Sequence, residues 1–134
     1  MCLSYELKPK QADKIKAEAR RRGYIRVWKV CEKRCTGWYK RTRWKKGLRK
    51  ALHLRRDDGG WYAYLNHEEA KRTLYFESTY LYLKVCYTKA SWIKRLGFDA
   101  RGRKVGIFTH LCFPDWERGD MTIREFRAMC KGKK

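Results

Sequence analysis

The fold is decided by the stretch Tyr80-Leu81-Tyr82-Leu83-Lys84-Val85-Cys86-Tyr87, in which residues that favour β-strands fill both alternating faces. One face would carry Leu81, Leu83, Val85 and Tyr87, and the other would carry Tyr80, Tyr82, Lys84 and Cys86. A strand that is largely apolar on both faces is typical of the middle of a sheet. We therefore expect residues 80–87 to form a central strand.

Further strands are predicted before and after this one in the sequence. Three segments alternate apolar and aromatic positions in the way that favours a strand: residues 24–30, 38–44 and 104–113. Residues 52–54 and 61–65 flank an Asp-Asp-Gly-Gly turn and are typical of a β-hairpin. The prediction is a mostly antiparallel sheet of about five strands.

Helices are predicted at both ends of the chain. Pro9 suits the first position of a helix that ends at Arg22, because Gly23 can adopt the left-handed conformation that closes a helix. The run Thr122-Ile123-Arg124-Glu125 matches a capping box and predicts a last helix. Residues 131–134 are expected to be a frayed basic tail.

The remaining segments are predicted to connect these elements. Asn66 is a suitable N-cap for a short helix that ends near Phe76. Residues 45–50 are interpreted as a basic connector, and residues 91–96 as a helical turn. The whole chain, residues 1–134, is therefore predicted to be one small α+β domain with N- and C-terminal helices.

The positive charge of the chain is large and uneven. Lys and Arg number 35 against 14 Asp and Glu, which gives a net charge of +21 on 134 residues. Residues 24–60 alone hold thirteen Lys and Arg against three acids, a local net charge of +10. Self-repulsion of this size opposes compaction, so we expect a polyanionic partner such as RNA or DNA. The 15% aromatic content argues against a disordered basic tail.

Flat rings accompany the cations in this segment. The second predicted strand would place Tyr39, Arg41 and Arg43 on one face, where cations can contact phosphates and a ring can stack on a base. The candidate nucleic-acid-binding residues are Arg34, Trp38, Tyr39, Lys40, Arg41, Arg43, Trp44, Lys45, Lys46, Arg49, Lys50, Arg55 and Arg56. Trp28 and Trp61 are instead expected in the core, because large aromatic side chains are mostly buried.

Four of the nine cysteine and histidine positions suggest a metal site when they are considered together. Cys31 and Cys35 form a C-x3-C pair, and His110 and Cys112 share a face of a predicted strand, so the four could supply a Cys3His zinc set. The spacing departs from C-x2-C, the two pairs lie far apart in the sequence, and free cysteine is a common core residue. We therefore assign no metal and no cofactor.

Acids and histidines leave a catalytic alternative open. The acids at 57–58 and the run Glu69-Ala70-Lys71 loosely match the D…ExK pattern of nucleases whose carboxylates hold Mg²⁺. That pattern needs ExK on a strand, whereas these acids are typical of a helix N-terminus. His53, His67 and His110 could act as acid-base catalysts, but none lies in a recognisable signature, so no catalytic residue is assigned.

The segment Gly60-Trp61-Tyr62-Ala63-Tyr64, followed by Glu68-Glu69-Ala70, resembles part of several small phage proteins. Some of those proteins are suspected of an ADP-ribosyltransferase-like fold, and the resemblance implies a transferase as a further alternative. It covers a small part of the chain. Paired Arg or His, Tyr and Glu motifs are not found at matching positions, so no catalytic residue is carried over.

The sequence thus predicts a protein that binds RNA or single-stranded DNA through a basic-aromatic face and acts by occupancy. Its size and charge suit a phage or mobile-element accessory protein. One alternative is a small enzyme acting on nucleic acid or nucleotide: a nuclease, a toxin-like ribonuclease or a transferase. Another is an inhibitor that binds an acidic protein or a ribonucleoprotein surface. No apolar run of membrane-spanning length and no signal peptide are seen, so no membrane partner and a cytoplasmic location are expected.

Overall fold

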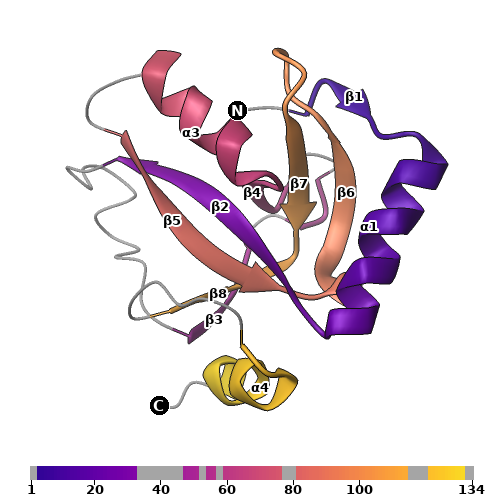
Figure 1. Ribbon diagram of the computed structural model, residues 1–134, viewed down its shortest axis with the longest axis vertical. Helices are drawn as coiled ribbons and strands as arrows, with labels where there is room; N and C mark the ends of the chain where they lie inside the picture. Colours follow the sequence, from indigo (N-terminus) through magenta and orange to yellow (C-terminus); the bar gives the residue numbers. More distant parts are fainter. Residues whose placement is uncertain are drawn as a thin grey trace.

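The computed structural model describes residues 3–32, 47–51, 54–56, 59–76, 81–114 and 121–131. These residues build one antiparallel sheet of eight strands, three α-helices and a 3₁₀ turn (Figure 1). The predicted α+β class is confirmed, with an antiparallel sheet as expected. Among the helices of this described part, none combines the length and apolar character needed to cross a membrane.

The elements follow one another in a β-rich order. The strands are β1 (Tyr5–Glu6), β2 (Ile25–Glu32), β3 (Gly47–Lys50), β4 (Trp61–Tyr64), β5 (Leu81–Thr88), β6 (Ile93–Phe98), β7 (Lys104–Phe108) and β8 (His110–Phe113). The helices are α1 (Pro9–Arg22), α3 (His67–Phe76) and α4 (Ile123–Lys131), and the 3₁₀ turn is η1 (Ala90–Trp92).

The strand predicted to be central is central. The sheet order is β1-β6-β7-β4-β2-β5-β8-β3, so β5 lies between β2 and β8. β2 and β5 stay in register over eight residue pairs, from Ile25 opposite Thr88 to Glu32 opposite Leu81. Val85, Cys86 and Tyr87 are all buried. The apolar character of both faces of this stretch therefore reflects packing on both sides of the sheet.

Two strands that follow each other directly in the sequence lie far apart in the strand order, so the sheet must curl strongly. β7 and β8 are separated only by Thr109, yet they are the third and seventh strands of the sheet. The backbone N–H of Thr109 donates to the carbonyl of Trp92 at 2.8 Å, and its own carbonyl accepts from Ala51 N–H at 2.8 Å. Thr109 thus carries the chain from one part of the sheet to another, and the prediction of one continuous strand over residues 104–113 is wrong at this residue.

The curled strands enclose a compact apolar cluster. It comprises Val27, Ala63, Cys86, Phe108, Leu111 and Phe113, contributed by five different strands, β2, β4, β5, β7 and β8. Gly106 is closely packed beneath the ring of Phe108, where an added Cβ would lie 2.4 Å from that ring. The cluster holds the strands in their curled order.

The prediction of about five strands is wrong, because three segments pair as strands against expectation. Residues 47–50, the described part of the predicted connector at 45–50, form β3 against β8. Of the helical turn predicted at 91–96, residues 91–92 lie in η1, whereas residues 93–96 belong to β6. β1 adds a two-residue edge to β6. Residues 52–53 of the expected hairpin lie outside the described residues, and its other segment forms β4, which pairs with β2 and β7. The strand predicted at 38–44 lies outside the described residues.

The predicted helices are confirmed, and their caps are visible. Gly23 has a φ of 89° and donates its N–H to the carbonyl of Ala19 at 2.8 Å, which ends α1 after Arg22. Before α4, Thr122 N–H donates to Glu125 Oε1 at 2.9 Å and Glu125 N–H donates to Thr122 Oγ1 at 3.1 Å. The capping box read from the sequence is therefore formed.

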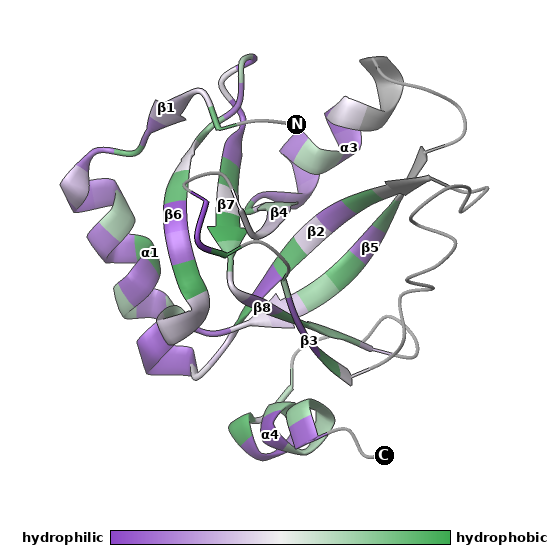
Figure 2. Ribbon diagram, turned by 180° about the vertical axis from the view of Figure 1, so that it is seen from behind, coloured by the Kyte–Doolittle hydropathy of each residue, from purple (hydrophilic) through white to green (hydrophobic). Residues whose placement is uncertain are grey.

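The helices cover the outside of the curled sheet (Figures 1 and 2). Coloured by hydropathy, α1 is mostly hydrophilic, whereas much of β5 and β7 is apolar. α4 packs through Phe126, whose ring stacks on Tyr24 with centroids 5.5 Å apart. The Tyr24 hydroxyl donates to the Met121 carbonyl at 2.7 Å and accepts from Met121 N–H at 2.6 Å. α4 is thereby tied to the start of β2.

Candidate nucleic-acid interface

Nine of the thirteen residues predicted to bind nucleic acid lie outside the described residues. They are Arg34, Trp38, Tyr39, Lys40, Arg41, Arg43, Trp44, Lys45 and Lys46. The other four are described. Arg49 and Lys50 belong to β3, and Arg55 and Arg56 lie in the turn that precedes β4. The structure therefore places the C-terminal part of the predicted face.

β3 is an outermost strand of the sheet and carries two of the predicted cations. Its pairing with β8 sets Lys50 opposite His110, and the Lys50 side chain is exposed. Arg49 is half-buried, and its carbonyl accepts the indole N–H of Trp61 at 3.1 Å. Trp61 also contacts Phe113, with ring centroids 5.3 Å apart. Trp61 thus helps to fix β3. The sequence predicts this residue in the core, and the structure shows it half-buried.

A single lysine organises the turn that carries Arg55 and Arg56. The ammonium of Lys94, on β6, donates to the carbonyls of Leu54 at 3.0 Å and Gly59 at 2.7 Å, and also to the carbonyl of Arg56. Charge-assisted hydrogen bonds of this kind are stronger than neutral ones. Both arginine side chains are exposed. Lys94 therefore holds in place a turn that presents two cations to solvent.

A basic-aromatic group that the sequence did not reveal lies beside β3. We call Lys50, Lys89, Trp92 and His110 the Trp92 cluster. The rings of Trp92 and His110 are stacked, with centroids 5.1 Å apart and an angle of 29° between their planes. The ammonium of Lys89 lies 4.7 Å from the centroid of the Trp92 ring. All three of these side chains are half-buried, so part of each remains accessible.

Hydrogen bonds fix the geometry of the Trp92 cluster. The carbonyl of Trp92 accepts the backbone N–H of Thr109 at 2.8 Å, which joins η1 to the residue between β7 and β8. The Thr109 hydroxyl lies 2.8 Å from Nδ1 of His110. The backbone N–H of Trp92 donates to the carbonyl of Lys89 at 3.0 Å. The stacked rings are thus attached to ordered backbone, which reduces the entropy that a ligand would otherwise have to remove.

The electrostatics of the cluster favour an anion. Burial lowers the pKa of His110, and the ammonium groups of Lys50 and Lys89 lower it further. The imidazole is therefore uncharged near neutral pH, and the two lysines supply the positive charge. A phosphate placed near them would be attracted by both.

α4 borders the cluster and adds positive charge. Phe126 of this helix lies near Trp92, with ring centroids 6.3 Å apart. The cations of α4, which are Arg124, Arg127 and Lys131, are all exposed. The helix that packs on the aromatic group thus presents cations to solvent.

Sequence reasoning missed the Trp92 cluster for a specific reason. Trp92 lies in a segment interpreted as a helical turn, and His110 was weighed only as a metal ligand or a catalytic base. The residues are 18 positions apart, and only the crossing of the chain at Thr109 brings them together. The one local signal was the basic-aromatic run from Lys89 to Trp92, which follows directly after the central strand.

Glu69, one acid of the possible nuclease pattern, serves the fold. Glu69 lies on α3, not on a strand, and its carboxylate accepts the backbone N–H of Lys104 at 2.9 Å. His67 stacks on Trp28, with ring centroids 5.1 Å apart, and Trp28 is half-buried between two core clusters. The acids at 57–58 and His53 lie outside the described residues. The ExK pattern needs its residues on a strand, whereas here they lie on a helix.

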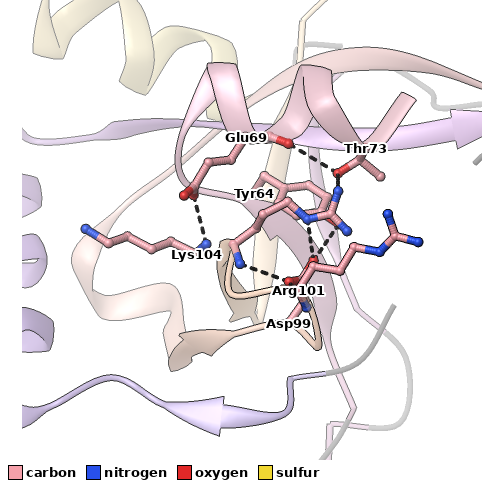
Figure 3. A network of polar contacts seen from close by, with 7 residues as sticks. Tyr64, Glu69, Thr73, Asp99, Arg101 and Lys104 are labelled. Atoms are coloured by element: carbon pink, nitrogen blue, oxygen red, sulfur yellow. Dashed lines mark hydrogen bonds and ion pairs between the residues drawn. The ribbon is translucent and has the colours of Figure 1, made fainter. Parts of the chain in front are cut away.

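A buried polar network lies between α3 and the turn that joins β6 to β7 (Figure 3). Asp99 accepts hydrogen bonds from the backbone N–H groups of Arg101 and Arg103 at 2.9 Å each, from Arg103 Nε at 2.9 Å and from the Tyr64 hydroxyl at 3.1 Å. Arg103 also donates to Thr73 Oγ1 at 2.6 Å. The network closes the turn between β6 and β7 and joins it to α3, so we interpret it as structural.

The two halves of the zinc set considered above are separated by the sheet register. Cys112 pairs with Tyr87, and Tyr87 pairs with Arg26, whereas Cys31 lies five residues further along β2. At about 3.3 Å per residue this is roughly 16 Å, too far for one ion. Among the described residues no group of three or more potential ligands forms, and Cys35 lies outside them. Cys112 instead contacts Cys130, with Sγ atoms 2.8 Å apart.

Comparison with known proteins gives no relative from which a role could be transferred. No protein-family model matches this chain, and no curated protein or solved structure matches it significantly.

Proposed function

We propose that this protein binds single-stranded nucleic acid, RNA or DNA, and acts by occupancy. The observation that carries the proposal is the Trp92 cluster, in which a preformed stack of Trp92 on His110 lies beside the ammonium groups of Lys50 and Lys89. Single strands are bound by cations that follow the phosphates and by rings that stack on bases. The Trp92 cluster contains both cations and rings, and its residues are held on ordered backbone.

The charge of the whole chain supports the same ligand. Of the net charge of +21, +10 lies in residues 24–60, and the described part of that segment presents Lys50, Arg55 and Arg56 to solvent. Phosphate contacts release condensed counterions, so the affinity should fall steeply with salt. Stacking on Trp92 would add affinity with little dependence on base sequence.

The proposal is tested by fluorescence polarisation with labelled ssRNA, ssDNA and duplex over a salt series. Replacing Lys50 and Lys89 by Glu should weaken binding to single strands and reduce the slope of log affinity against log salt by about 1.4, at roughly 0.7 per phosphate contact. Trp92→Ala should weaken binding by about tenfold, since one stacked base contributes about 1–3 kcal/mol. The double change of Lys10 and Lys14 to Glu on α1 is the charge-matched control.

The predicted face outside the described residues is tested in parallel by changing Arg41, Arg43, Lys45 and Lys46 to Glu. Equal effects of the control pair and the Lys50 and Lys89 pair would overturn the assignment of the Trp92 cluster. Strands cleaved on a denaturing gel would replace occupancy with an enzymatic function. Weak binding to all three nucleic acids would favour an acidic protein or ribonucleoprotein surface as the partner.

A further inference from the structure

Two cysteines from different elements meet beside the Trp92 cluster. Cys112 lies on β8 and is fully buried, and Cys130 lies near the end of α4 and is half-buried. Their Sγ atoms are 2.8 Å apart although the residues are separated by 18 positions. A disulfide bond is about 2.05 Å long, so the two sulfurs would have to approach by less than one ångström.

The two thiols differ in their chemistry. Either sulfur can donate in the contact between Cys112 and Cys130. When Cys112 donates to Cys130, the hydrogen bond lowers the pKa of Cys130; burial opposes this effect, and the nearby ammonium of Lys89 adds to it. The same contact raises the pKa of Cys112, and burial adds to that effect. The C-terminal end of a helix disfavours an anion, so the thiolate at Cys130 depends on these two neighbours. Cys130 is therefore the more reactive and more accessible thiol.

We infer that Cys130 is an oxidation site that Cys112 resolves, and that a peroxide converts the pair into a disulfide joining α4 to β8. In the first step the Cys130 thiolate attacks one oxygen of the peroxide and the O–O bond breaks. Cys130 becomes a sulfenic acid, and hydroxide or alkoxide leaves. In the second step the Cys112 sulfur attacks the Cys130 sulfur, the S–O bond breaks, and water leaves with the Cys112 proton.

The disulfide would fix a helix that the reduced protein holds by packing and capping. α4 rests on the sheet mainly through Phe126, which is buried against Tyr24 and close to Trp92. A covalent link from β8 to α4 would therefore secure the helix beside the Trp92 cluster. This inference does not depend on what the cluster binds.

The test uses the full chain with Cys2, Cys31 and Cys35 changed to Ser, so that Cys86, Cys112 and Cys130 remain. After treatment with hydrogen peroxide, the protein is unfolded in guanidinium chloride so that buried thiols can react. The remaining thiols are alkylated with iodoacetamide, and the protein is digested without reductant. The expected result is a linked pair of peptides containing Cys112 and Cys130, with Cys86 alkylated as before. The melting temperature should rise on oxidation and return with dithiothreitol, because a cross-link restricts the unfolded chain.

Three variants separate this inference from general oxidation. Cys112→Ser should leave Cys130 to oxidise to sulfinic acid, Cys130→Ser should leave Cys112 unreacted, and Lys89→Gln should slow disulfide formation. Cys86→Ala is the matched control and should leave the formation of the disulfide between Cys112 and Cys130 unchanged. The inference is overturned if Cys112 and Cys130 are both still alkylated after peroxide treatment, or if Cys130 links to Cys86 instead. If a variant fails to fold, the alkylation of Cys112 and Cys130 in the parent chain still tests the inference.

Discussion

Asp99 is the residue whose loss should cost the most stability. Its carboxylate is buried and is bonded to the guanidinium of Arg103, two backbone N–H groups and the hydroxyl of Tyr64. Asp99→Asn would leave Arg103 as a buried cation without its counterion, so we expect the free energy of unfolding to fall by about 3 kcal/mol. Urea unfolding at pH 7 measures this, with the exposed Asp13→Asn on α1 as control. A loss no larger than that of the control would contradict the structural role of the network.

The same residue predicts how stability depends on pH. Burial alone would raise the pKa of Asp99, but the N–H groups of Arg103 and Arg101 and the Arg103 guanidinium hold this pKa below its usual value. A carboxylate with a lowered pKa stabilises the fold above its unfolded pKa of about 3.9, and that contribution is lost as the pH falls through the folded pKa. The stability gap between wild type and Asp99→Asn should therefore narrow below about pH 4.

His110 reports on the electrostatics of the Trp92 cluster. Burial lowers its pKa, and Lys50 and Lys89 add to the effect. Lys89→Gln should therefore raise the pKa of His110, and a bound single strand should raise it as well, because phosphates oppose the lysine charges. NMR titration of the imidazole ring protons measures both changes. Lys14→Gln is the control, and an unchanged pKa of His110 on saturation with ssRNA would place the phosphates elsewhere.

Among the elements, the turn before β4 depends on a single side chain. The ammonium of Lys94 donates to three carbonyls of this turn, those of Leu54, Arg56 and Gly59. Lys94→Met should loosen the turn, because its carbonyls lose their shared donor, and should lower the free energy of unfolding by about 1–3 kcal/mol. Limited digestion with trypsin, which cuts after Arg55 and Arg56, should become several-fold faster. Lys10→Met, on the exposed side of α1, is the control, and equal digestion rates of the two variants would contradict the role of Lys94.

Local signals predicted the elements that depend on local chemistry. Gly23, the Thr122 capping box and the N-cap residue Asn66 act within a few residues, and the structure confirms all three. The central strand was also predicted, because its two apolar faces require cover on both sides. These features needed no knowledge of distant partners.

Pairing across the chain could not be predicted in the same way. β3 exists because β8 lies beside it, and its four residues, Gly47–Lys50, contain no run of β-forming residues. The break at Thr109 depends on bonds to Trp92 and Ala51, which are distant in sequence. This break brings the residues of the Trp92 cluster together. The sequence therefore shows the cations and rings of the cluster but not that they lie side by side.

At the scale of the whole molecule, the burial of apolar side chains favours the folded state, and repulsion between the cations opposes it. A buried apolar cluster enclosed by a curled sheet must hold together a chain of net charge +21. The pair of Asp99 with Arg103 has both side chains largely inaccessible, whereas the pairs of Arg21 with Glu18, Lys71 with Glu68 and Arg95 with Glu6 are more exposed. Repulsion between cations is therefore expected to be relieved mainly by ions or a polyanion outside the protein.

This balance predicts that salt stabilises the free protein while it weakens binding to nucleic acid. Raising NaCl from about 20 mM to about 300 mM shortens the Debye length by several-fold, so repulsion among the cations weakens and the free energy of unfolding should rise. Urea unfolding across this range measures the effect. Sodium sulfate at equal ionic strength is the comparison: an equal gain would indicate screening alone, and a larger gain would indicate that anions also bind or act on hydration. Stability that stays constant or falls with NaCl would show that the cations of the folded protein are already compensated within the chain.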